Sequence, residues 1–170
     1  RGAIRVPVRV MLPGNKLFPT LAVGSLPRDQ WVFDVVEARN EGRIGAAEAD
    51  VLLDGAVMSA VRMQEQAGPD FVSDGEWRRN SYTRVFTDAV DGFTRDLQPP
   101  RKYATAAQPA VTSRIVQRGP LSTGDAAFLQ ANARAGTIAT LPSPYSVGAT
   151  AWTAEHSAAV YPSRAEAMEA

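Results

Sequence analysis

The sequence contains no cysteine and a single histidine, His156. Without cysteine, these residues form no disulfide framework, offer no thiol nucleophile and provide no thiolate metal ligand. One imidazole leaves no cluster of histidine ligands for a metal ion. Basic and acidic side chains balance at 18 each, giving a formal net charge of zero. That balance argues against nucleic acid as the main partner.

Long apolar runs are also lacking. No stretch of the sequence approaches the roughly 18 to 20 continuous apolar residues of a membrane span. Arginines interrupt the first ten residues, which therefore do not read as a signal peptide. We expect no membrane partner and a cytoplasmic location. The 170 residues, 45% of them apolar and 21% charged, are typical of one globular domain.

Short apolar runs alternate with helical patterns from Leu17 onward. This alternation implies parallel strands joined by helical crossovers. An α/β fold is therefore predicted, either a doubly wound open sheet or part of an eight-stranded β/α barrel. Four strands match about the first four units of a (β/α)8 TIM barrel, because complete barrels take about 250 residues. Strands are expected at 20–23, 70–73, 111–116 and 137–141; helices at 29–40, 46–67, 85–93, 125–135 and from Ser163; and a long loop at 94–109.

The two ends of the sequence suggest a partial chain. It begins with Arg1 rather than methionine. Ser163 and Glu166 have the spacing of a capping box, which starts a helix, but the sequence ends within the second turn of that helix. We therefore expect a truncated barrel over residues 17–170, preceded by an N-terminal extension over residues 1–16.

Candidate functional residues follow the expected strands, since the carboxyl ends of parallel strands face the ligand in both architectures. Gly24 and Ser25 follow the first strand. Their backbone amides and the Ser25 hydroxyl are suited to an anionic group such as a carboxylate, and the glycine lets a ligand approach the main chain closely. The alternative is an ordinary turn from strand to loop.

A denser group of charged residues follows the second strand, at 74–79. Glu76 is suited to hold an ammonium group, and Arg79 to pair with a carboxylate in a bidentate fork. Trp77 would then lie against an aromatic ligand. The alternative is a loop whose charges neutralise one another, with Trp77 packed beneath it.

Four markers occur in an order that resembles the catalytic barrel of the cobalamin-independent methionine synthase family. The resemblance covers the N-terminal half of that barrel and nearly the whole chain. It implies transfer of a methyl group from 5-methyltetrahydrofolate polyglutamate to the sulfur of homocysteine, in methionine biosynthesis, with a zinc ion that deprotonates the thiol. The markers are Val23–Pro27, Gln64–Gly68, Asp74–Glu76 continuing through Asp91–Phe93, and Leu141–Tyr145.

The resemblance also implies roles for individual residues. Val23, Gly24 and Ser25 correspond to the segment that binds the homocysteine carboxylate. Glu76 corresponds to the glutamate that holds the amino group. Arg79 matches an arginine of the same motif, near the expected folate side. No catalytic residue and no zinc ligand is assigned to this chain, because the family's ligands lie in the other half of the barrel.

Two departures from the family pattern leave the substrates open. The synthases carry an arginine–cysteine pair that contacts folate, and residues 103–107 contain neither. A tryptophan expected after the fourth strand falls on Thr150, with Trp152 two places away. One alternative is a relative with another methyl donor, or one that alkylates another thiol. A second is a non-enzymatic half-barrel that binds a small amino acid or self-associates through its open edges.

Overall fold

The computed structural model describes residues 16–87, 89–99, 107–119 and 121–170. The expected N-terminal extension, apart from Lys16, lies outside the described residues, as do residues 103–106 of the segment that departs from the family pattern. The helices are α1 (Gln30–Asn40), α2 (Ala46–Ala67), α3 (Arg84–Thr87), α4 (Thr123–Asn132), α5 (Pro144–Ala151), α6 (Ala154–Ser157) and α7 (Arg164–Glu169). The strands are β1 (Phe71–Val72), β2 (Val90–Gln98), β3 (Gln108–Gln117) and β4 (Gly136–Thr137).

The first two helices form where the sequence predicts them. α1 ends just before Gly42, and α2 ends at Gly68, whose left-handed conformation (φ 80°) lets its amide bond the last turn of the helix. The apolar stripe of α2 is buried and packs against α1. Local signals are enough for these two helices, because capping and periodicity act within a few residues.

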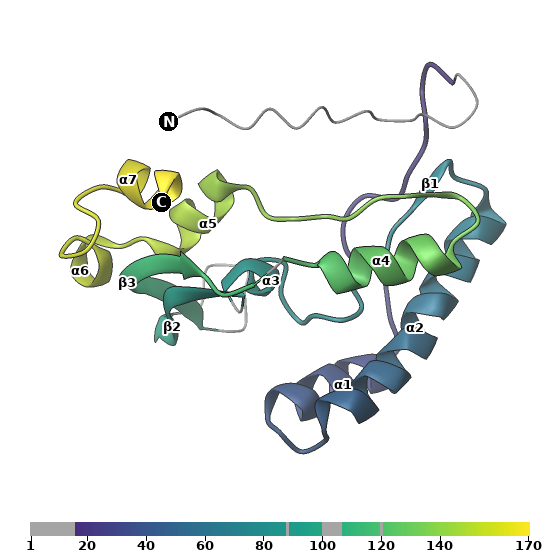
Figure 1. The fold of residues 1–170 in the computed structure, drawn as a ribbon, viewed down its shortest axis with the longest axis horizontal. Helices are drawn as coiled ribbons and strands as arrows, with labels where there is room; N and C mark the ends of the chain where they lie inside the picture. Colours follow the sequence, from purple (N-terminus) through teal and green to yellow (C-terminus); the bar gives the residue numbers. More distant parts are fainter. Residues whose placement is uncertain (1–15, 88, 100–106, 120) are drawn as a thin grey trace.

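Three segments run parallel, as the alternation of strands and helices predicts. Leu21 forms a parallel bridge with Phe71. β1 pairs in parallel with β4, in the register Phe71 to Gly136 and Val72 to Thr137. The order is therefore Leu21, β1, β4. The first connection contains α1 and α2, and the second contains α3, the β2–β3 hairpin and α4 (Figure 1). This arrangement brings the residues after each segment to the same edge.

A strand forms at 111–116 as expected, but its expected parallel pairing is wrong. Those residues belong to β3, which pairs antiparallel with β2, and β2 occupies part of the segment expected as a loop at 94–109. The helix expected over 85–93 is shortened to α3 for the same reason. Residues 94–97 are exposed, and an antiparallel hairpin tolerates a solvated face whereas a parallel strand is covered on both.

Two apolar clusters support the two ends of the molecule. The larger one joins α1, α2, β1 and α4, and includes Trp77. The smaller one joins the β2–β3 hairpin to the C-terminal helices, where the Tyr161 hydroxyl accepts a hydrogen bond from the Ile115 amide at 2.8 Å. These groups of elements lie at opposite ends of Figure 1. Among the described residues, no helix has the length and hydropathy needed to traverse a bilayer.

Candidate functional site

A buried glutamine holds the end of β1 in place. The Gln64 side chain is 5% exposed and comes from the apolar face of α2. Its Nε2 donates to the Ser73 carbonyl at 2.8 Å, and its Oε1 accepts from the Ser73 amide at 3.0 Å. The Ser73 hydroxyl in turn accepts from the Gly75 amide at 3.1 Å. The loop that carries Glu76 therefore leaves the strand in a defined direction.

The Glu76 backbone adopts a conformation that is uncommon for a residue with a side chain. Its φ is 61°, and that of the preceding Gly75 is 67°. The Asp74 carboxylate stabilises this turn by accepting the Glu76 amide at 3.0 Å. Non-glycine residues in the left-handed region cost about 1 to 3 kcal/mol and cluster at functional sites. The turn directs a side chain that is only 5% exposed toward the first and third parallel segments.

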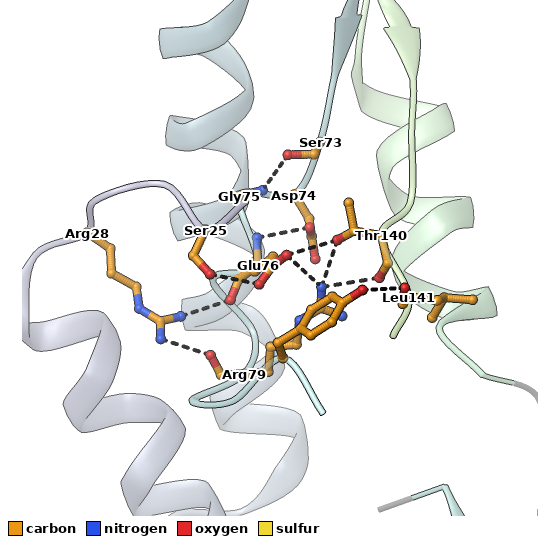
Figure 2. A network of polar contacts seen from close by, with 10 residues as sticks. Ser25, Arg28, Ser73, Asp74, Gly75, Glu76, Arg79, Thr140 and Leu141 are labelled. Atoms are coloured by element: carbon orange, nitrogen blue, oxygen red, sulfur yellow. Dashed lines mark hydrogen bonds and ion pairs between the residues drawn. The ribbon is translucent and has the colours of Figure 1, made fainter. Parts of the chain in front are cut away.

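The Glu76 carboxylate joins three segments that are distant in the sequence (Figure 2). The Ser25 hydroxyl donates to Oε2 at 2.7 Å. The Thr140 hydroxyl donates to Oε1 at 3.1 Å, and the Arg79 guanidinium lies 3.3 Å from the same oxygen. Thus Ser25, Glu76 and Arg79, which the sequence singles out after two different strands, meet in one cluster.

Arg28 stabilises the loop that carries Glu76. Its guanidinium donates to the carbonyls of Glu76 at 2.9 Å and Arg79 at 2.8 Å, and it stacks over the Phe33 ring at 4.0 Å. Burial lowers the pKa of Arg28, while nearby Glu76 opposes that shift. An arginine remains cationic at neutral pH even so. Sequence reasoning missed this residue, although it directly follows the marker Val23–Pro27.

Other residues of the two motifs lie differently. Val23 is 90% exposed, and Gly24 has a φ of 82° that favours glycine. Trp77 is 8% exposed in the larger core, and its indole donates to the Leu26 carbonyl at 3.2 Å. Trp77 therefore packs beneath the loop, as expected in the alternative to contact with an aromatic ligand. Arg78 pairs with Asp54 and with Asp125 rather than with Glu76.

Arg78, Asp54 and Asp125 form a second group of ion pairs. Arg78 lies 3.2 Å from Asp125. Burial raises the pKa of the Asp125 carboxyl, and Arg78 counteracts that effect. The group lies beside the Glu76 cluster, because Asp74, Arg79 and Asp125 line the same small cavity. Its one guanidinium is paired with both carboxylates, so Arg78 is engaged within the protein.

The arrangement is suited to binding rather than to acid–base chemistry. The Glu76 carboxylate accepts two hydroxyls and faces a guanidinium, and a carboxylate is also the natural acceptor for a ligand ammonium. Ser25 reaches it through its hydroxyl, and Gly24 directly precedes Ser25 in the same segment. Within the described ranges, no group of three or more His, Asp or Glu side chains is placed to hold a metal ion. The donor set of a zinc site is therefore not found in this part of the chain.

Parallel segments with helical crossovers define an α/β fold, in which the carboxyl ends of the strands are the usual place for a ligand. Comparison with known families gives a more specific assignment. Residues 18–138 match the family described as cobalamin-independent synthase, catalytic domain. The chain belongs to this family, which confirms the resemblance drawn from the sequence markers.

Individual relatives agree with this assignment. The chain is 27% identical over 134 residues to a methionine synthase of Saccharolobus solfataricus, covering 77% of this chain and 40% of that protein. It is 34% identical over 113 residues to a 5-methyltetrahydropteroyltriglutamate–homocysteine methyltransferase of Acidiphilium cryptum, covering 59% of this chain and 14% of that protein. The chain thus spans less than half the length of these curated relatives.

Solved structures share the fold. A B12-independent methionine synthase from Shewanella sp. W3-18-1, determined in complex with selenomethionine, superposes with a TM-score of 0.69 at 22% identity, over 88% of this chain and 43% of that one. A putative vitamin-B12 independent methionine synthase from Listeria monocytogenes gives a TM-score of 0.61 at 22% identity, over 91% of this chain and 50% of that one.

Proposed function

We propose that these residues form the amino-acid-binding part of a homocysteine methyltransferase. The observation that carries the proposal is the hydrogen bond between Ser25 and the buried Glu76, two residues 51 positions apart. In this proposal the Glu76 carboxylate holds the ammonium group of homocysteine. The main-chain amides of Gly24 and Ser25, with exposed Val23 beside them, receive the carboxylate, and Arg79 lines the side from which the methyl donor approaches.

Charge and burial support this assignment. An ammonium group pairs with a carboxylate in a charge-assisted hydrogen bond, which is roughly twice as strong as a neutral one. Glu76 is 4% exposed, so bulk water screens such a pair only weakly. Arg79 and Arg28 surround the loop with positive charge, which favours a ligand that also carries a carboxylate.

The wider architecture and chemistry are proposed on the same basis. The parallel order Leu21, β1, β4 and the likeness to the Shewanella structure support the first units of a (β/α)8 barrel over residues 17–170. The methyl donor proposed is 5-methyltetrahydrofolate polyglutamate, as the name of the Acidiphilium relative indicates. Zinc would activate the homocysteine thiol, but no step of that activation is assigned to these residues, since the described ones do not fit a zinc site. The cytoplasmic location stays a prediction.

Calorimetric titration of the 170-residue protein with homocysteine tests the binding site. We expect measurable binding by the wild-type protein and a loss on the order of tenfold or more in Glu76→Gln, which removes the charge but keeps the shape. Glu48→Gln, an exposed change in the first turn of α2, is the control and should bind like wild type. Equal affinity of Glu76→Gln and wild type would contradict the proposal.

A further inference from the structure

The two oxygens of the Glu76 carboxylate have different surroundings. Oε1 accepts the Thr140 hydroxyl at 3.1 Å and lies 3.3 Å from Nη2 of Arg79. Oε2 accepts only the Ser25 hydroxyl, at 2.7 Å, from the described residues. A carboxylate has about four lone-pair positions, two on each oxygen. Oε1 therefore accepts one hydrogen bond and faces a cation within the protein, whereas Oε2 has a position left for a ligand.

A single hydroxyl links the two charged side chains on the Oε1 side. Thr140 Oγ1 donates its proton to Glu76, and it accepts from Nη2 of Arg79 at 2.9 Å. The same Nη2 also donates to the Thr140 carbonyl at 3.2 Å. Figure 2 shows Thr140 entering this cluster from the segment that follows β4. The Thr140 hydroxyl thus forms hydrogen bonds with a carboxylate and a guanidinium at the same time.

Arg79 depends on this link for its orientation. Its side chain is 12% exposed, and its Nε is buried without a hydrogen-bond partner among the described residues. Among the described residues, the hydrogen bonds and the ion pair of its guanidinium all run through Nη2. Without the Thr140 hydroxyl, both Arg79 and Glu76 would lose a partner at one of their charged atoms.

We propose that Thr140 is a positioning residue that fixes Glu76 so that Oε2, and not Oε1, faces the ligand ammonium. This inference rests on the proposed amino-acid site and adds to it the residue that orients the binding carboxylate. Thr140 does not touch the ligand itself. Its effect should therefore depend on the ligand's amino group, because only that group is held by Glu76.

Calorimetry with Thr140→Val and Thr140→Ser tests the inference. Valine has nearly the shape of threonine without the hydroxyl. The dissociation constant of Thr140→Val for homocysteine should rise on the order of tenfold, because hydrogen bonds to charged groups are lost. Serine keeps the hydroxyl and should restore affinity to within about threefold of wild type. Thr140→Ala is a second hydroxyl-free variant, and Thr94→Val, in the β2–β3 hairpin, is the matched control.

A ligand without the amino group separates positioning from a general loss of structure. 4-Mercaptobutanoate keeps the thiol and the carboxylate of homocysteine. We expect wild type and Thr140→Val to bind it with equal affinity, because Glu76 has no ammonium to hold. Equal loss for both ligands, or unchanged homocysteine affinity in Thr140→Val, would overturn the inference alone. Failure of wild type to bind homocysteine would instead overturn the proposed function on which it rests.

Discussion

Asp70 collects three donors from the segment that leads into the first parallel strand. Its carboxylate accepts Lys16 Nζ at 2.7 Å, the Thr20 amide at 2.8 Å and the Thr20 hydroxyl at 2.9 Å. The hydrogen bond from Lys16 is the largest cause that lowers the pKa of Asp70, from 3.8 to about 2. Asp70 therefore ties residues 16–20 to the start of β1, before the Ser25 loop begins.

The stability that Asp70 contributes should depend on pH. Because the folded pKa of Asp70 lies below its unfolded value of 3.8, its contribution to stability is full above that value and is lost as the pH falls toward about 2. Asp70→Asn should therefore be less stable than wild type at pH 7, and the difference should shrink between about pH 4 and pH 2. Urea unfolding at several pH values measures it. A difference that is independent of pH would refute this role.

A second prediction at this scale concerns Gln64. Replacing it with methionine keeps the length of the side chain but leaves the amide and carbonyl of Ser73 without their buried partners. The variant should lose about 1 to 3 kcal/mol of unfolding free energy. Gln66→Met, an exposed position on the same helix, is the control and should change stability little. Equal stability of both variants would show that water replaces the lost bonds.

Single residues also show how far the sequence predicts the site. Ser25, Glu76 and Arg79 are found from their places after expected strands and from the family markers, and the structure brings them together. Arg28 and Thr140 are missed. Both act on Glu76 or its loop across 48 and 64 sequence positions, and no local pattern records such a contact.

At the scale of elements, the longer helices α1, α2 and α4 are predicted, whereas α5, α6 and the pairing of β2 with β3 are not. α2 is found with its bounds because periodicity and a terminal glycine are local signals. The pairing of β2 with β3 is not, since it joins residues such as Val90 and Gln117 and the alternation of exposed side chains fits either a loop or a strand edge. The sequence analysis therefore assigned β3, one strand of an antiparallel hairpin, to the parallel sheet.

The hairpin gives a third prediction, at Gly92. This glycine has a φ of 106° at a register irregularity, and an added Cβ would lie 2.8 Å from the Arg114 carbonyl oxygen. Gly92→Ala should destabilise the protein by about 1 to 3 kcal/mol. Gly124→Ala, in α4 with open space around it, should be neutral or slightly stabilising. Thermal unfolding of both variants makes the comparison, and equal midpoints would contradict the strained geometry.

At the scale of the whole molecule, neither outer edge of the parallel segments is paired among the described residues. Among the described residues, no strand pairs with the far side of the Leu21 segment. Leu17 and Phe18 are each 87% exposed near this edge, and Val23 is 90% exposed. Unpaired strand edges and exposed apolar side chains both promote association with another chain. The sequence predicts the open edge from the expected half-barrel, but not which side chains would line it.

We propose that the 170-residue protein self-associates through this edge. Sedimentation velocity should show an average mass that rises with protein concentration. Phe18→Lys should weaken the association, because a lysine at the edge adds charge and removes apolar area. Val51→Lys, an exposed apolar position on α2 away from the edge, should leave it unchanged. A monomer at every concentration, or an equal effect of the two lysines, would show that this edge is not the contact surface.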